Sequence, residues 1–224
     1  MWHAFDTQEA YLAEIVDKVS TLLEQAVAVQ GRAGLAVSGG KSPIPLFERL
    51  SQADIPWDKV HIALVDERFV PPTDPDSNEW LVRRYLLANR ASRAAFTGLV
   101  SDPADLQRCV AQANCLPRDI TVAILGMGDD GHTASLFPDA PQLPQALDTS
   151  RSQRYLHVSP PAAPHERISM TLAALLDAQE LVLAIADGHK RGIFEQAARQ
   201  ATPALPVSYL IAQTGVPLNV YWQA

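Results

Sequence analysis

The chain has 224 residues, of which 47% are hydrophobic and 19% are charged. This composition allows a sizeable buried core and excludes an intrinsically disordered chain. The formal net charge of −7 provides no global attraction for nucleic acid or an anionic membrane, so an anionic ligand needs a local cluster of basic groups. The two cysteines, Cys109 and Cys115, fit neither a disulfide framework nor a C-x-x-C motif, and we interpret them as buried or idle thiols.

Signals for export or membrane insertion are missing from the sequence. The first residues, MWHAFD, lack the basic segment and the apolar core of a signal peptide, and no apolar run reaches the length of a membrane span. We therefore expect a cytoplasmic protein, formed by a single domain over residues 1–224, with no nucleic-acid or membrane partner. We expect it to be a monomer or a weak homo-oligomer.

The N-terminal part of the chain predicts one long helix followed by a short strand. Apolar residues recur at helical spacing between positions 12 and 26, which is typical of an amphipathic helix. Asp6 and Glu9 have the spacing of a capping box, and Gly31 is expected to end the helix. The apolar residues 34–37 then predict a strand.

A glycine turn, SGGKSP over residues 38–43, follows this strand. Ser42 is expected to cap a helix and Pro43 to occupy its first position. Free backbone N–H groups at such a turn suit a phosphate, and Lys41 adds a full positive charge. The spacing matches neither a Walker loop nor G-x-G-x-x-G, so ATP and NAD are poorly supported. A simple connecting turn remains the alternative.

Three charged residues, Asp66, Glu67 and Arg68, come directly after a predicted strand over residues 60–65. Turns usually use Gly, Asn or Ser at such places, so a carboxylate and a guanidinium there indicate an edge that faces a ligand. A proline-rich loop then leads to a helix near Asn78. We expect Asn78 either to donate to a ligand or to serve only as a polar residue of the capping region.

The central segment ITVAILGMGDDGHTASLFP, residues 120–138, combines an apolar run with three glycines, two carboxylates and a histidine. The apolar run predicts a buried strand of a parallel sheet. The loop after such a strand lies at the edge where open α/β sheets bind ligands. His132, two residues after Asp130, exchanges a proton near neutral pH, and we predict that it is a general acid or base. A tight turn with capping residues is the alternative.

Strands alternate with helices along the rest of the chain. A strand over residues 181–185 precedes a helix with Lys190 in its first turn. A cation there opposes the helix dipole, which indicates an anion nearby. The alternation predicts an α/β fold, a single-domain Rossmann-like structure with a largely parallel sheet and helices on both faces.

Polar or basic residues thus follow four predicted strands, at positions 38–41, 66–68, 126–132 and 188–190. The ends of parallel strands meet at one edge of a sheet, so these four segments are expected to share one pocket. They combine a phosphate cradle, cations and a carboxylate–imidazole pair, with no metal cluster and no nucleotide fingerprint. The pattern predicts an enzyme that transfers a proton on a small phosphorylated molecule.

The motifs SGGKSP, DERFV, GMGDDGHTASLFP, RISMT and GHK together resemble those of the 6-phosphogluconolactonases. These belong to a larger group with the glucosamine-6-phosphate deaminases and isomerases, and the match covers about residues 35–197. The resemblance implies a Rossmann-like α/β sheet and hydrolysis of 6-phospho-D-glucono-1,5-lactone to 6-phosphogluconate in the oxidative pentose phosphate pathway. It implies no cofactor and no metal, and a phosphorylated sugar lactone as the only small-molecule partner.

The resemblance also implies roles for individual residues. His132 is expected to be the base that activates water, oriented by Asp130. The expected substrate-binding residues are Ser38, Gly39, Gly40, Lys41, Asp66, Arg68, Asn78, Gly128, Arg167 and Lys190, although Lys41 stands where the family commonly has a smaller residue. Deaminase relatives place a glutamate at the position of Phe137, so a deaminase or isomerase is the second choice. A sugar-phosphate-sensing domain is a more remote alternative, because the region before Leu35 holds no basic patch.

Overall fold

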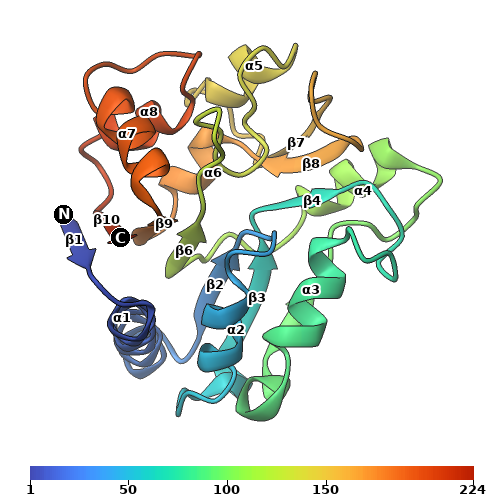
Figure 1. Cartoon of the computed structure of the whole chain (residues 1–224). Helices are drawn as coiled ribbons and strands as arrows, with labels where there is room; N and C mark the ends of the chain where they lie inside the picture. Colours follow the sequence, from blue (N-terminus) through green and yellow to red (C-terminus); the bar gives the residue numbers. More distant parts are fainter.

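Seven parallel strands form the central sheet in the computed structural model, which describes residues 1–224 (Figure 1). Their order across the sheet is β1-β10-β9-β6-β2-β3-β5. Their bounds are Trp2–Phe5 (β1), Leu218–Gln223 (β10), Glu180–Ala186 (β9), Val122–Leu125 (β6), Ala33–Val37 (β2), Val60–Leu64 (β3) and Ala95–Thr97 (β5). The prediction of an α/β fold with a largely parallel sheet is therefore confirmed.

A second, smaller sheet contains three antiparallel strands in the order β4-β8-β7, namely Asp66–Arg68, Arg167–Met170 and Tyr155–Val158. Residues 66–68, which the sequence placed directly after the strand over residues 60–65, themselves form a strand, because they pair as β4 with β8. The chain changes sheets at Val65, whose N–H still donates to Val37 O at 2.9 Å while its carbonyl accepts from the N–H of Met170 at 2.8 Å. The charged residues after β3 are thus held by strand pairing.

Eight α-helices and two short 3₁₀ helices cover the sheets. The α-helices are Gln8–Gln30 (α1), Ile44–Leu50 (α2), Asn78–Tyr85 (α3), Leu106–Ala113 (α4), Leu143–Leu147 (α5), Leu172–Leu176 (α6), Gly188–Ala197 (α7) and Val207–Ala212 (α8), and the 3₁₀ helices are Trp57–Lys59 (η1) and Asn89–Arg93 (η2). In Figure 1, α1, α2 and α3 lie on one side of the large sheet, and α7 and α8 lie on the other. None of the helices has both the length and the apolar character that crossing a membrane requires.

The first helix shows how the sequence pattern becomes packing. Five apolar residues at helical spacing face the core, Leu12, Ile15, Val19, Leu23 and Ala26. Thr7 is the N-cap and accepts from the N–H of Ala10, so the predicted Asp6–Glu9 capping box is wrong; Glu9 pairs with Arg49 of α2 instead. Gly31 ends the helix with φ +73°, as predicted. At α2, Pro43 is the N-cap and no side chain caps the helix, so the role predicted for Ser42 is also wrong.

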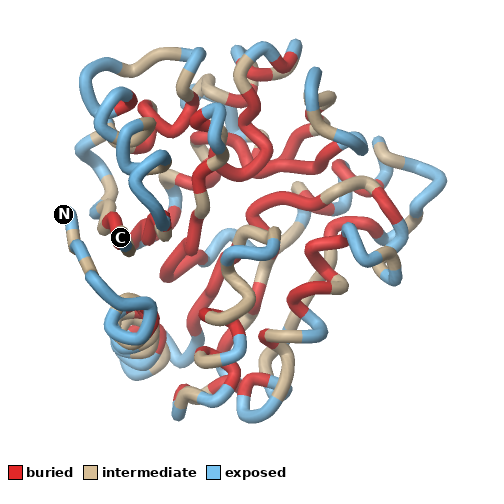
Figure 2. The backbone as a smooth tube through the Cα atoms, in the orientation of Figure 1, coloured by how far each residue is buried: buried red, intermediate tan, exposed pale blue.

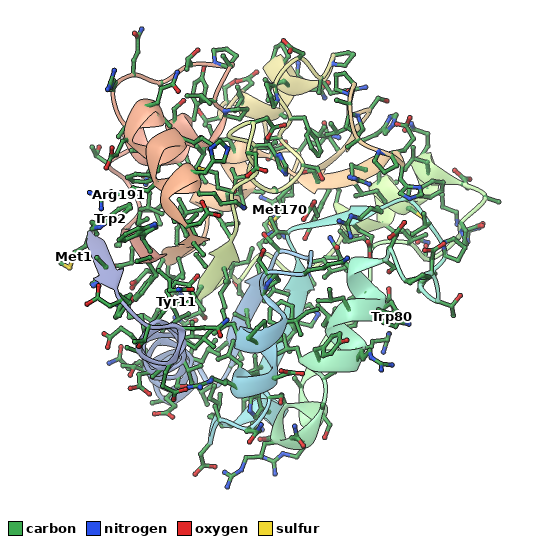
Figure 3. The ribbon with its side chains drawn as sticks, viewed as in Figure 1. Met1, Trp2, Tyr11, Trp80, Met170 and Arg191 are labelled. Carbon is green, nitrogen blue, oxygen red and sulfur yellow. The ribbon has the colours of Figure 1, made fainter.

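The N-terminal residues form an edge strand for which the sequence pattern gave no signal. β1 pairs in parallel with β10. The ring of Trp2 packs against Phe194 of α7 with 4.9 Å between centroids, and Trp2 lies beside Arg191 of the same helix (Figure 3). The first and last strands therefore close one side of the sheet together.

Burial follows the sheet, as Figure 2 shows by the red segments that run through the centre of the molecule. Every residue of β2 and β6 is buried, which is why both strands appear in the sequence as continuous apolar runs. The buried apolar side chains form one connected core that extends from α1 to β10. Of the two free cysteines, Cys109 is buried in this core and Cys115 is exposed.

Strands β2 and β6 are neighbours, and the chain leaves them in opposite directions. From β2 the chain continues toward β3 and β5, whereas from β6 it continues toward β9 and β10. The loops after β2 and β6 therefore diverge onto opposite faces of the sheet. Such a switch in strand order opens a crevice at the carboxyl edge, where α/β proteins bind ligands.

Candidate active site

A cavity of about 480 Å³ lies at this switch point, between the loops after β2, β6 and β9 and the small antiparallel sheet. Ten of the twelve predicted site residues line it: Ser38, Gly39, Gly40, Asp66, Arg68, Asn78, Gly128, His132, Arg167 and Lys190. Asp130 does not line the cavity but contacts His132. Lys41 is exposed and does not line the cavity, although its neighbours Gly40 and Ser42 do. The structure thus brings together all four predicted segments.

The loop after β6 holds the imidazole of His132. Asp130 Oδ1 lies 2.5 Å from His132 Nδ1 and accepts the backbone N–H of His132 at 3.1 Å. When Nδ1–H donates to Asp130, Nε2 keeps a free lone pair. Partial burial disfavours the Asp130 anion, but the hydrogen bonds from His132 outweigh it and hold the pKa of Asp130 below its ordinary value. The carboxylate therefore stays ionised and orients the ring.

Gly128 makes room for this arrangement. A Cβ at position 128 would lie 2.2 Å from His132 Cε1 and Nδ1 and 2.8 Å from Asp130 Oδ1. No side chain fits at these distances, so any residue other than glycine would displace the ring. The Phe137 ring covers the imidazole, with 4.3 Å between centroids. One side of His132 is therefore apolar, and no carboxylate stands at position 137.

The small sheet contributes a row of polar groups to the opposite wall. Arg68 Nη1 donates to Asn78 Oδ1 at 3.0 Å and to Asp76 O at 2.8 Å, and Asn78 Nδ2 donates to Asp66 O at 2.8 Å. Gly39 packs against Asn78, since a Cβ at position 39 would lie 1.8 Å from Asn78 Oδ1. Asn78 thus orients Arg68 and packs against the glycine turn at Gly39. Its side-chain oxygen and nitrogen both have protein hydrogen-bond partners.

Two buried donors in the cavity wall have no protein partner. They are Ser38 Oγ and Arg167 Nη1. Arg167 is only 5% exposed, and burial lowers the pKa of its guanidinium while the carboxylate of Asp66 opposes that shift. Buried polar groups are nearly always satisfied, so donors without partners in a cavity wall indicate a ligand with acceptor oxygens.

Lys190 reaches the cavity from the first turn of α7. Its Nζ donates to Met127 O at 2.6 Å, one residue before Gly128. The N-cap residue Asp187 accepts the backbone N–H of Lys190 at 2.9 Å, which fixes the start of the helix. The ammonium group therefore lies against the loop that carries His132.

Three side chains that the sequence pattern did not single out complete the site. Glu67 is 1% exposed and joins β4 to the start of α3 through hydrogen bonds from Asn78 N, at 2.6 Å, and Glu79 N, at 2.7 Å. Ser135 Oγ donates to Asp66 Oδ2 at 2.5 Å, and His165 lines the cavity. The only feature of the sequence that pointed to Glu67 was its place in the charged motif of residues 66–68. Ser135 lay inside the central motif without being singled out, and His165 had no signal, because their partners Asp66 and Asp76 are remote in sequence.

The chain matches the family described as "Glucosamine-6-phosphate isomerases/6-phosphogluconolactonase" over residues 6–222. It is 40% identical to the 6-phosphogluconolactonase of Neisseria meningitidis serogroup A, over 99% of this chain and 98% of that protein. It is 38% identical to the 6-phosphogluconolactonase of Caulobacter vibrioides, over 98% and 95% of the two chains. The crystal structure of a 6-phosphogluconolactonase from Shewanella baltica superimposes with a TM-score of 0.94 at 36% identity and covers 100% of this chain and 97% of that one.

Proposed function

Because the chain belongs to the glucosamine-6-phosphate isomerase/6-phosphogluconolactonase family, we propose that it hydrolyses 6-phospho-D-glucono-1,5-lactone to 6-phosphogluconate. Two relatives with 38–40% identity over nearly the whole chain carry the lactonase name. The observation that carries the proposal is the cavity itself. It holds an imidazole with a carboxylate partner, and its wall contains the unpaired donors of Ser38 and Arg167.

In the proposed reaction His132 is the general base. Its Nε2 removes a proton from water as the water oxygen attacks the lactone carbonyl, and Asp130 stabilises the resulting imidazolium. General-base catalysis of this kind contributes about 10²–10⁴ in rate. Positioning of the lactone beside the imidazole adds to this factor, because it replaces a bimolecular encounter.

Collapse of the tetrahedral intermediate requires a second proton transfer. The bond between the carbonyl carbon and the ring oxygen breaks, and the imidazolium of His132 returns the proton to the departing oxygen. Backbone N–H groups of the glycine turn at Gly39 and Gly40, together with Arg68, are the proposed donors to the developing oxyanion. The product carboxylic acid then releases one proton to water, which balances the reaction.

Recognition of the substrate is proposed to rest on the cationic wall. Arg167 is buried and has a free N–H group, and Lys190 lines the same cavity with its ammonium group on Met127 O. A guanidinium and an ammonium both bind phosphate and sugar oxygens through charge-assisted hydrogen bonds. Ser38 Oγ supplies a neutral donor between them. The six-carbon lactone fits within the 480 Å³ of the cavity.

A direct assay tests this proposal. The purified chain is mixed with freshly generated 6-phosphogluconolactone, and acid release is followed after the spontaneous rate is subtracted. A parallel assay measures ammonia release from glucosamine 6-phosphate. We expect lactone hydrolysis and no ammonia, since Phe137 occupies the position beside His132 that a ring-opening carboxylate would need. Ammonia release without lactone hydrolysis would instead assign the chain to the deaminase branch.

The same proposal includes a cytoplasmic enzyme that acts as a monomer or a weak homo-oligomer. His132, Asp130 and the cationic groups of the proposed site all come from one chain, and we expect one copy to suffice for catalysis. Sedimentation at micromolar concentration, combined with the lactonase assay over the same range, checks this point. A specific activity that falls on dilution would contradict it.

A further inference from the structure

A second cavity, of about 280 Å³, lies away from the candidate active site and shares no lining residue with it. It is formed by Arg118 in the connection from α4 to β6, by the connection from α5 to β7, and by α6 with Asp177 at its end. The small sheet separates the two cavities: Arg167 at the start of β8 faces the first, and the helix that follows β8 lines the second.

Three arginines line this second cavity, Arg118, Arg151 and Arg154, together with one carboxylate, Asp177. Arg151 Nε is paired with Asp148 at 3.2 Å, and Arg118 is exposed. The chain as a whole is acidic, with a net charge of −7, but basic side chains cluster around this cavity. Asp177 is the one carboxylate among the lining residues, and Asp148 and Asp119 add negative charge close to the arginines.

Arg154 is the unusual member of this group, because its side chain is buried and only half satisfied. The residue is 2% exposed. Its Nη1 donates to Pro117 O at 2.7 Å and to Leu116 O at 3.4 Å, whereas Nε and Nη2 are buried without a protein acceptor. These two nitrogens form the side edge of the guanidinium, the fork that binds both oxygens of a carboxylate or phosphate.

The surroundings of Arg154 favour the entry of a negative charge. Burial lowers the pKa of Arg154 and the nearby charge of Arg118 acts in the same direction, although Tyr155, Asp177 and Asp119 oppose the shift. A bound anion would offset both unfavourable effects. Residues 151 and 152 of the wall are exposed and have no regular secondary structure. Because Nε and Nη2 of Arg154 are buried, binding of an anion to the fork requires a displacement of this segment.

We propose that this cavity is a second anion-binding site, which takes the carboxylate or phosphate group of a small metabolite on the Nε–Nη2 edge of Arg154, with Arg118 and Arg151 at its entrance. A purely structural role for Arg154, in which it only satisfies the carbonyls after α4, is the competing explanation. The two differ in whether an oxyanion binds saturably at this place.

Nuclear magnetic resonance of the full chain separates these explanations. Inorganic phosphate is titrated while the Arg154 Nε–Hε signal and the Ser152 amide report on the second cavity, and the amides of Gly39 and Gly40 report on the first. Succinate replaces phosphate in a parallel arm. Saturable shifts at Arg154 and Ser152 with either anion support the proposal, and the stronger arm identifies the preferred oxyanion. No saturable shift with either anion overturns it.

Variants distinguish specific binding from general charge attraction. Arg154→Lys keeps the charge and removes the fork, but it changes a buried residue, so the exposed Arg118→Gln is the main variant. We expect Arg118→Gln to weaken phosphate binding at the second cavity about tenfold and to leave the Gly39 and Gly40 shifts and the lactonase rate unchanged. Arg93→Gln, another exposed arginine outside both cavities, is the matched control. Equal titration curves for Arg118→Gln and the unaltered protein would overturn the proposal.

Discussion

The loop that carries His132 and the small sheet that carries Arg68 and Arg167 hold their charged groups in different ways. In the loop, Asp130 and His132 are two residues apart and their side chains are 45% and 29% exposed. In the small sheet, Asp66 is buried and bonds Ser135, which is 69 positions away in sequence. Short-range bonds thus leave a proton-transferring group in contact with water, whereas long-range buried bonds build a stiff wall for binding.

This difference has a physical basis. A general base must exchange protons with solvent in every cycle, so partial exposure is useful to it. A wall that positions a substrate must resist displacement, and buried hydrogen bonds are stronger and more rigid than exposed ones. Changes in the loop are therefore expected to affect kcat, and changes in the small sheet to affect stability.

The largest effect is expected from His132→Asn. The substitution removes the proposed base but keeps a polar side chain of similar size beside Phe137. We expect kcat to fall by about 10²–10⁴, with an unfolding midpoint close to that of the unaltered protein. Stopped assays of lactone hydrolysis, corrected for the spontaneous reaction, measure this, and a rate within twofold of the original would remove His132 from the mechanism.

A slightly smaller loss of kcat is expected from Gly128→Ala, which keeps the imidazole of His132 and changes only its position. The new Cβ would lie 2.2 Å from the ring of His132 and must displace it. A displacement of about 1 Å costs on the order of 10² in rate. The control is Gly192→Ala in α7, where a Cβ would meet no atom within 4 Å. We expect that control to retain full activity and to gain up to about 1 kcal/mol of stability.

Glu67→Gln tests the small sheet, and its main effect is expected on stability. Each Glu67 oxygen accepts two hydrogen bonds: Oε1 from Arg68 N and Asn78 N, and Oε2 from Ser77 Oγ and Glu79 N. An amide nitrogen in place of either oxygen faces donors and cannot accept from them. We expect a loss of about 1–3 kcal/mol in the free energy of unfolding, measured by urea denaturation.

The pH dependence of this loss follows from the titration of Glu67. Burial raises the pKa of Glu67 to about 7 against the hydrogen bonds that favour the anion. The folded state therefore binds more protons than the unfolded state between pH 4.5 and about 7, and the contribution of Glu67 to stability is full at low pH and declines as the pH rises. The destabilisation by Glu67→Gln should be larger at pH 5 than at pH 8. The exposed Glu24→Gln should show no such difference.

The smallest effect is expected from Lys41→Ala. The sequence places Lys41 in the phosphate cradle, but the side chain is exposed and does not line the cavity. We expect KM and kcat to change by less than about twofold, as is usual for an exposed charge. The matched variant Lys190→Ala removes an ammonium that does line the cavity and should raise KM about tenfold. Equal effects of the two variants would show that the turn at Gly40 brings Lys41 to the substrate.

Local patterns in the sequence were sufficient for much of the fold and for the reactive loop. Continuous apolar runs identified the strands β2 and β6, which are buried along their whole length. The largely apolar runs of β3 and β9 were also recognisable, although they include His61 and Glu180. The Gly128–Asp130–His132 arrangement was also readable, since all its members lie within one turn of chain. The parallel order of the strands then placed four predicted segments at one edge of the sheet.

The sequence by itself therefore determined that His132 lies beside Asp130 at the end of a buried strand, because both residues belong to the same short loop. Only the tertiary structure decided that Asp66, Glu67 and Arg68 form a strand, that Asn78 orients Arg68, and that Lys41 does not line the cavity. The strand pairs residues 66–68 with residues 167–169, which lie about 100 places further along the chain, and the bond between Arg68 and Asn78 spans ten places. Such contacts leave no periodic or local signal, since they form only when the whole sheet has assembled.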